Sequence, residues 1–164
     1  MDPAQATLMA RYNRWMNERI YALLSPVEDA ERKQERGAFF GSIHDTLDHV
    51  HTGDLIWMAR FERLERPPVA IGRRNLESFV ELRSAREAMD ERILRWAEGL
   101  SPEWLAADHT WRSRIDGNAR THKAWHLVTH LFNHQTHHRG QVTTLMFQMG
   151  IDPGVTDLPL MPEA

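Results

Sequence analysis

Histidines at regular intervals are the residues of this sequence that are best suited to chemistry. The chain has 164 residues and 10 histidines, and six of them fall between His122 and His138. Imidazole is the commonest metal ligand in proteins. Residues four apart lie one turn apart on the same face of a helix, so an i, i+4 pair of histidines can bind one metal ion. Five of the six follow this spacing: His122, His126, His130, His134 and His138.

Helical geometry selects one pair from this series. Each residue turns a helix by about 100°, so each step of four slips around the helix by about 40°. With His138 at the centre of the apolar face, His134 lies about 40° to one side, and the earlier members drift toward solvent. His134 and His138 are therefore predicted to point inward as a metal-binding pair. The alternative is a histidine-rich helix with one or two hydrogen-bonded histidines in the core.

A metal site needs at least one further ligand, and the segment 39–64 could supply it. Three neutral histidines with an open coordination position form a Lewis-acid site, which can activate water or hold a thiolate. Nitrogen ligation suits zinc, nickel, copper and iron, and the sequence does not choose among them. The segment contains three histidines and three acids that could complete the site: His44, His49, His51, Asp45, Asp48 and Asp54.

Length and composition limit the class of protein. The length predicts one domain spanning residues 1–164, with a core that needs no disulfides. The chain has no cysteine, which excludes disulfides, cysteine-based zinc sites and a cysteine nucleophile. A net charge of −3 does not favour a nucleic-acid partner. Because no signal peptide or membrane-spanning apolar run is evident, we expect a soluble cytoplasmic protein without a membrane partner.

Four segments have the apolar periodicity of amphipathic helices: residues 3–24, 39–64, 76–98 (or from 78) and 122–149. The densely charged segment 28–37 is predicted to be a solvated connection. Residues 101–120 lose the helical period, and Asp116-Gly117 is a turn signal. A short β-hairpin or an extended loop is expected there. Four residues of this segment favour a strand: Trp104, Thr110, Trp111 and Ile115.

These elements predict an all-α fold, a four-helix bundle with a short irregular or β-hairpin insertion between the third and fourth helices. His49 lies nearly opposite the main apolar stripe of the second helix, beside Gly53 and Ile56. This helix is therefore expected to have two buried faces, one toward its own bundle and one toward a second chain. The helical wheel does not show which face is which. The Glu-x-x-His repeats of di-iron bundles are absent.

The fourth predicted helix contains the stretch Asn133-His134-Gln-Thr-His-His138-Arg139-Gly140-Gln141, which resembles the N-H-x-x-x-H-R-G-Q signature of the DinB/YfiT-like family of bacterial metal-dependent proteins. A second similar stretch is Ser42-Ile43-His44-Asp-Thr46-Leu47-Asp-His49-Val50, followed by Asp54 and Trp57. A third is Tyr12-Asn13-Arg14-Trp15-Met16-Asn17, and the tail 150–159 also looks like family members. The resemblance extends over nearly the whole chain.

The resemblance implies a four-helix bundle in which three histidines bind one divalent metal ion, zinc or nickel. Carried over by position, the ligands are His49, His134 and His138. The helical wheel agrees for the pair on the fourth helix, whereas His49 rests on the family motif alone. His51 and His44 remain alternatives to His49.

Relatives of known activity imply a thiol-dependent reaction. They are maleylpyruvate isomerases and S-transferases that use mycothiol or bacillithiol, and their metal is thought to hold the thiolate of the cofactor. A low-molecular-weight thiol is therefore an expected cofactor here, and a homodimer is the expected assembly. Many other relatives have no established reaction.

Three hypotheses about function follow. The first is a metal-dependent enzyme, either a thiol-dependent S-transferase or isomerase or a hydrolase, that acts on a small molecule. The second is a non-catalytic metal-binding stress-response protein with the same ligands. The third is a histidine-rich helical dimer without a physiological metal. No general base can be named from the sequence, because Asp48 and Asp54 flank His49 without a known orientation.

Overall fold

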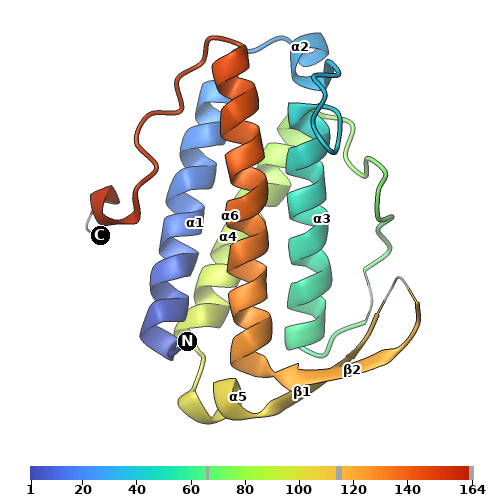
Figure 1. The fold of residues 1–164 in the computed structure, drawn as a ribbon, viewed down its shortest axis with the longest axis vertical. Coiled ribbons are helices and arrows are strands. Elements are labelled where there is room, and N and C mark those ends of the chain that lie inside the picture. The colour runs from blue at the N-terminus through green and yellow to red at the C-terminus, as the bar shows by residue number, and fades with distance from the viewer. Residues whose placement is uncertain (66, 114–115, 163–164) are drawn as a thin grey trace.

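Four long helices lie side by side along the length of the molecule (Figure 1). The computed structural model describes residues 1–65, 67–113 and 116–162. The predicted class, a mainly helical bundle with a small hairpin, is confirmed. The long helices are α1 (Pro3–Leu24), α3 (Ile43–Phe61), α4 (Phe79–Glu98) and α6 (Ala124–Gln148). The short elements are α2 (Asp29–Lys33), α5 (Pro102–Ala106), β1 (Asp108–Arg112), β2 (Ala119–Lys123) and the 3-10 helix η1 (Leu158–Leu160).

Side-chain caps explain where α1, α3 and α4 begin. Asp2 accepts the backbone N–H of Gln5 at 2.8 Å, and the Gln5 side chain accepts the N–H of Asp2 at 3.0 Å, which forms a capping box before α1. Ser42 and Ser78 cap α3 and α4 by accepting the N–H three residues on. The helix expected over 39–64 therefore begins only at Ile43, whereas the helix expected over 3–24 is confirmed.

The charged segment 28–37 is more than the solvated connection that was predicted. It contains α2, and Arg32 is buried. Arg32 Nη1 donates to the carbonyl oxygen of Leu24 at 2.9 Å and also to that of Val27. Its guanidinium Cζ lies 4.2 Å from the ring centroid of Phe79. Arg32 is buried because it donates hydrogen bonds to carbonyl groups at the end of α1 and just after it, and because it stacks on Phe79, the first residue of α4.

β1 and β2 pair as an antiparallel hairpin beside the first turn of α6 (Figure 1). His122 was predicted to begin the fourth helix, but it belongs to β2, because it pairs with His109 of β1. Trp104 does not lie in a strand either, because α5 precedes the hairpin. Ile115 lies outside the described residues. The predicted turn includes Gly117, whose φ of 73° favours glycine.

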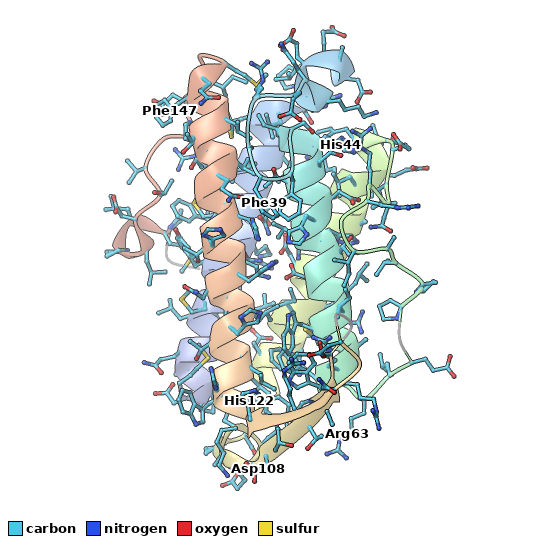
Figure 2. The ribbon with its side chains drawn as sticks, turned by 45° about the vertical axis from the view of Figure 1, so that its right-hand side comes forward. Phe39, His44, Arg63, Asp108, His122 and Phe147 are labelled. Atoms are coloured by element: carbon cyan, nitrogen blue, oxygen red, sulfur yellow. The ribbon has the colours of Figure 1, made fainter. Side chains whose placement is uncertain are left out.

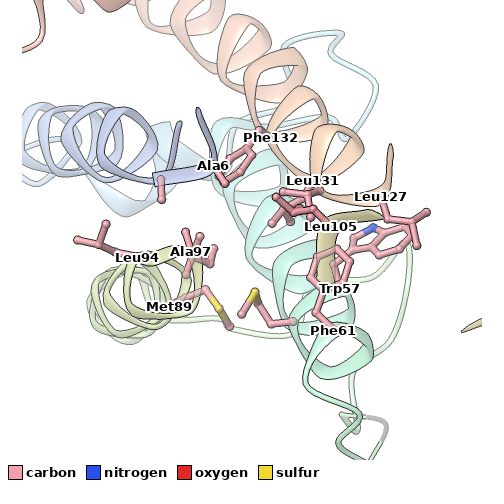
Figure 3. Packing of buried hydrophobic residues seen from close by; sticks show 14 residues of the cluster. Ala6, Trp57, Phe61, Met89, Leu94, Ala97, Leu105, Leu127, Leu131 and Phe132 are labelled. Carbon is pink, nitrogen blue, oxygen red and sulfur yellow. The ribbon is translucent and has the colours of Figure 1, made fainter. Parts of the chain in front are cut away.

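Apolar side chains form two clusters toward opposite ends of the bundle, and their burial is the main favourable term for folding. The cluster near the hairpin is drawn in Figure 3 and includes Trp57, Phe61, Met89, Leu94, Ala97, Leu127, Leu131 and Phe132. The cluster near α2 includes Met16, Ile20, Leu24, Ile43, Leu82, Val142 and Met146.

Buried polar and charged groups lie between the two clusters, and every long helix contributes at least one of them. Arg86 of α4 is only 2% exposed, and its guanidinium is 2.5 Å from a carboxylate oxygen of Asp54 on α3 and 2.9 Å from one of Asp90. Asn13 and Asn17 of α1 donate to Asp90 at 3.1 and 2.9 Å. Burial raises the pKa of Asp90 to about 6, and the nearby Arg86 cation opposes this shift.

Helix α6 completes this buried polar layer. Gln135 donates to Asp54 at 2.9 Å, and Arg139 donates to the side-chain oxygen of Asn13 at 3.0 Å. Buried charges are costly unless they are paired and hydrogen-bonded. The layer therefore constrains how α1, α3, α4 and α6 can pack, and this packing determines which side chains meet at the α3–α6 contact.

Candidate metal centre

Three histidines from two helices converge where α3 contacts α6. His49 projects from α3, and His134 and His138 lie one turn apart on α6. Their ligand nitrogens all lie within 4.8 Å of one another, and Nε2 of His49 is 3.2 Å from Nε2 of His134. The structure thus brings together the three residues that were predicted as ligands.

A glycine on α3 makes room for this approach. A Cβ atom built on Gly53 would lie 2.9 Å from Cε1 of His134, which is closer than such atoms normally approach. His49 is one turn earlier on the same face of α3. The face of α3 that carries His49 and Gly53 is therefore the face that packs on α6 of the same chain.

The ring of His138 is oriented by a neighbour on its own helix. Nδ1 of His138 lies 2.8 Å from the side-chain oxygen of Gln141, which can only accept, so Nδ1 carries the proton. Nε2 then keeps its lone pair for a metal ion. Such an outer partner is the usual arrangement behind a histidine ligand. Nδ1 of His134, by contrast, is buried without a hydrogen-bond partner among the described residues.

Burial keeps the three imidazoles neutral. It lowers the pKa of His49 to about 4, with a smaller contribution from repulsion by His138. Burial lowers the pKa of His134 to about 3, with repulsion from His138 and His49 adding to the effect. Burial also lowers the pKa of His138. All three rings are therefore neutral at neutral pH, which is the form that binds metal ions.

Phe40, from the loop before α3, covers the cluster. Its ring stacks on His49 with centroids 3.8 Å apart and meets the edge of His138 at 5.4 Å. The neighbouring Phe39 is 84% exposed, and Figure 2 shows it between α6 and α3. Phe40 therefore limits the movement of two of the three imidazoles and shields them from water.

The donor set fits a small divalent ion. Zinc–nitrogen bonds of about 2.0–2.1 Å in a tetrahedral site place ligand nitrogens about 3.3 Å apart. The observed separation of 3.2 Å between His49 and His134 is close to that value. Neutral, partly buried nitrogen donors suit zinc, nickel, copper or iron, and three of them leave a coordination position for another molecule.

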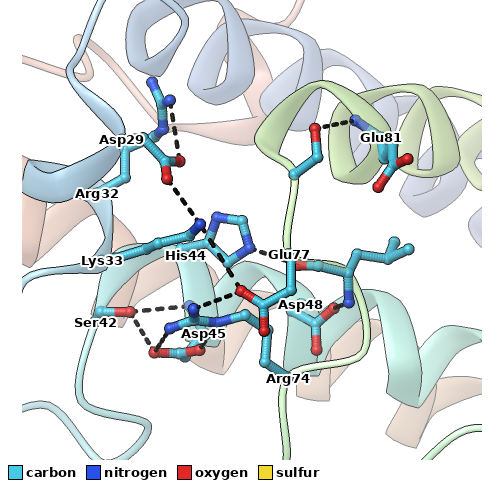
Figure 4. Close-up of polar contacts among 12 residues, drawn as sticks. Asp29, Arg32, Lys33, Ser42, His44, Asp45, Asp48, Arg74, Glu77 and Glu81 are labelled. Atoms are coloured by element: carbon cyan, nitrogen blue, oxygen red, sulfur yellow. Dashed lines mark hydrogen bonds and ion pairs between the residues drawn. The ribbon is translucent and has the colours of Figure 1, made fainter.

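The alternative histidines of α3 point elsewhere. His44 is fully buried, and its Nε2 lies 2.7 Å from the carbonyl oxygen of Leu76 in the loop before α4 (Figure 4). His51 is also buried, and burial together with the Arg86 cation lowers its pKa to about 3. Neither belongs to the group of converging nitrogens.

The acids of α3 are engaged away from the three histidines. Asp48 accepts the backbone N–H groups of Asn75 and Leu76 at 2.9 and 3.0 Å. Asp45 pairs with Arg74, and both contacts lie in the region drawn in Figure 4. Asp54 belongs to the buried polar layer. Neither Asp48 nor Asp54, the two acids considered as general bases, is positioned beside the candidate metal centre.

Two cavities adjoin the cluster, and His49 lines both of them. One of about 330 Å³ lies between the loop 35–41 and the loop 70–74, and its lining includes Arg73 and Arg74. The other, of about 290 Å³, extends from His49 and His134 toward the hairpin and includes Trp57 and Trp111. We call the second one the hairpin cavity. A small molecule can therefore approach His49 from either cavity, and His134 from the second.

Sequence reasoning missed several residues of the site. Gln141 stands three residues after His138, so the i, i+3 spacing on a helix was a usable signal. Gly53 was predicted to lie beside His49. The space that it leaves for the ring of His134 depends on how α3 and α6 pack, and the sequence does not show this packing. The stacking of Phe40 on His49 had no sequence signal, because Phe40 comes from an irregular loop.

Two helices of this bundle present three converging histidines. This arrangement defines a class of helical-bundle proteins that are able to bind a metal ion. The chain belongs to the DinB family, because the sequence model of that family matches residues 2–164. It is similar to the protein DinB of Bacillus subtilis (strain 168), with 28% identity over 154 residues that cover 91% of this chain and 88% of that protein. Among the described residues, no helix has the length and apolar character needed to traverse a bilayer.

Proposed function

We propose that this protein is a divalent-metal-dependent enzyme in which His49, His134 and His138 hold zinc or nickel. The observation that carries the proposal is the convergence of their nitrogens within 4.8 Å from two helices. The bound ion would supply Lewis-acid chemistry and lower the pKa of a ligand in the open position. The protein supplies the rest: Gln141 orients His138, and Phe40 shields the imidazoles.

The surroundings favour thiol chemistry over hydrolysis. Two carboxylates line the polar cavity beside His49, and both are engaged: Asp45 by Arg74, and Glu35 by the backbone N–H of Gly37. A thiol has a pKa near 8.5 even when it is free, whereas water depends entirely on the bound ion to ionise near neutral pH. Because the chain has no cysteine, the thiol would be a low-molecular-weight cofactor. The proposed reaction is S-transfer or isomerisation of a small molecule.

The second candidate is a non-catalytic metal-binding stress-response protein. This candidate is favoured by the observation that Asp48 and Asp54 form their hydrogen bonds and ion pairs away from the three histidines. Such a protein would bind the ion but would accelerate no reaction of a thiol with an electrophile. A homodimer remains a prediction from the family resemblance, and sedimentation of the purified protein would test it.

Metal content measured by mass spectrometry on untagged protein is the first test. We expect about one ion per chain in the wild type, because three protein ligands are the usual complement of a zinc site with an open position. The ion should be lost in His49→Ala and in His134→Ala. His126→Ala is the matched control, because His126 is exposed on the same helix as His134. A metal content that is the same in all four proteins would contradict the site.

Activity is the second stage of the test. Metal-loaded wild type would be assayed with bacillithiol, mycothiol and glutathione against a panel of electrophiles, beside metal-free protein. Turnover that depends on both metal and thiol supports the enzyme. Stoichiometric metal without turnover in any combination supports the non-catalytic alternative.

A further inference from the structure

Two histidines of the regular series, His122 and His126, lie outside the candidate metal centre and close to each other. Their ring centroids are 5.0 Å apart, and the ring planes are almost perpendicular at 85°. Within the centre, the rings of His49 and His134 have centroids 5.1 Å apart, and their Nε2 atoms are 3.2 Å apart. The ring spacing of His122 and His126 is therefore compatible with ligation of one ion by both imidazoles. We call these two residues the outer pair.

The junction between β2 and α6 brings the outer pair together. His122 belongs to β2, so helical periodicity alone does not place it beside His126. Lys123 has extended backbone angles and precedes the first turn of α6 directly. The N–H of Ala124 donates to the carbonyl oxygen of Ala107 at 2.9 Å, which ties this junction to the segment before β1. Figure 2 shows His122 at the hairpin end of α6. The backbone at the junction therefore sets the approach of the two rings.

The surroundings of the outer pair suit a weakly held transition-metal ion. His126 is exposed and His122 is partly exposed, so water can complete the coordination of an ion. Lys123, which lies between them in the sequence, has its Nζ 2.8 Å from a carboxylate oxygen of Asp108, and this pairing offsets its charge. Imidazole nitrogen favours copper, nickel and zinc, whereas magnesium and calcium prefer oxygen.

The outer pair should hold its ion less tightly than the candidate metal centre. In the part of the chain that the structure describes, three or more ligands converge only at His49, His134 and His138. The outer pair thus offers two protein ligands where the centre offers three. An ion at the outer pair would therefore exchange more readily.

The outer pair and two ligands of the centre lie along the same helix. His126 and His134 are eight residues apart, which corresponds to about 12 Å along the axis of α6. His130 lies halfway between them and lines the hairpin cavity together with His134. The ring centroids of His130 and His134 are 5.9 Å apart. An imidazole therefore occurs at each turn of α6 between the outer pair and the centre.

We propose that the outer pair is a second, weaker site for a divalent transition-metal ion, and that it captures ions which then load the centre. At the outer pair the ion has already exchanged water for imidazole, and His130 offers the next imidazole one turn further along α6. The capture site rests on the ring geometry, whereas the loading role rests on the proposed function, which places an ion at the centre. The weaker ion is lost on desalting, so His126→Ala keeps the single ion of the purified protein.

Capture can be tested in protein without the centre. In the double variant His134→Ala/His138→Ala, calorimetric titration with Ni²⁺ should show about one bound ion per chain, the capacity of one histidine pair. Addition of His126→Ala to this double variant should abolish the binding. His137→Ala is the matched control, because it removes an exposed histidine elsewhere on α6, and it should leave the binding intact.

A measurement on the intact centre makes capture testable even if the double variant unfolds. Zinc-loaded wild type titrated with Ni²⁺ should show one weak binding event that is absent in His126→Ala. Circular dichroism of the double variant verifies that its helices are retained.

Loading can be followed in metal-free protein with Co²⁺, whose visible absorption reports its coordination by the centre. At limiting Co²⁺, the centre of His126→Ala should fill several-fold more slowly than that of the wild type and reach the same final occupancy. Gln148→Ala should load like the wild type, because Gln148 is exposed near the far end of α6.

Three results would overturn the proposal: no Ni²⁺ binding in the double variant and in zinc-loaded wild type, binding that His126→Ala leaves unchanged, or equal loading rates in wild type and His126→Ala. Equal rates with one ion at the centre would leave the proposed function intact. A wild type that binds Ni²⁺ at the outer pair but no ion at the centre would contradict the proposed function and the loading role, and would leave the capture site standing.

Discussion

Nε2 of His49 and Nε2 of His134 lie 3.2 Å apart, although 85 positions separate the two residues in the sequence. The contact joins α3 to α6, and it depends on the absence of a side chain at Gly53. Most of the predictions below follow from this junction and from the buried polar layer that holds the two helices together.

Zinc should stabilise the wild type against thermal unfolding, and a chelator should reverse the effect. At a hundredfold excess over the dissociation constant, mass action contributes about 2.7 kcal/mol to the free energy of unfolding. His49→Ala should lose this stabilisation. His51→Ala should retain it, although it is less stable in itself. Scanning calorimetry with and without zinc would measure both, and retention in His49→Ala would show that another residue is the third ligand.

Gln141→Ala should weaken zinc binding by about 10–100-fold, as loss of an outer hydrogen-bond partner typically does. Without the acceptor at Gln141, the ring of His138 can rotate and its Nδ1–H is unsatisfied. Competition with a chromophoric zinc chelator measures the affinity. Gln148→Ala is the control, since Gln148 is exposed near the end of the same helix. Equal affinities in the two variants would refute a role for Gln141 in orienting His138.

Gly53→Ala and Gly140→Ala should have opposite effects on stability. The added methyl group at position 53 meets His134 at 2.9 Å, so we expect a loss of about 1–3 kcal/mol and weaker metal binding. Gly140 lies within α6 and has no atom within 4 Å of the added group, so alanine should stabilise the protein by about 0.4–1 kcal/mol. Denaturant unfolding of both variants would check the pair, and a stabilising Gly53→Ala would mean that α3 and α6 are not held at this distance.

Arg86→Met should be strongly destabilising. It leaves Asp54 and Asp90 buried without their cation, and breaking a buried ion pair costs about 3–5 kcal/mol. Arg83→Met removes an exposed ion pair with Glu87 on the same helix and should change stability by no more than about 1 kcal/mol. Urea unfolding would measure both. Similar losses in the two variants would show that the buried polar layer is not a structural requirement.

His51 should make the protein less stable in acid. Its pKa in the folded state is lowered to about 3, below the value of about 6.5 in the unfolded chain. The unfolded state therefore binds more protons between these values, so stability falls as the pH drops below about 6.5. The slope is at most about 1.4 kcal/mol per pH unit for one group. The stability of His51→Gln should therefore fall less steeply between about pH 6.5 and about pH 4, which lies inside the window bounded by the two pKa values. An unchanged slope would assign the acid sensitivity to other groups.

The sequence by itself determined the local features of this protein. The i, i+4 spacing of His134 and His138 and their place on an apolar face followed from helical periodicity, as did the helix over 3–24. The helical class and the hairpin alternative were also predictable. These features depend on residues that are close in the chain, where backbone geometry sets the distances.

Only the tertiary structure decided which face of α3 meets α6. The helical wheel placed His49 away from the main apolar stripe and left His44 and His51 open. It could not show that Asp48 caps the loop before α4 or that Asp54 joins Arg86 in the core. A wheel gives the direction of each side chain around one helix axis, but the neighbour in that direction depends on the simultaneous packing of α1, α3, α4 and α6.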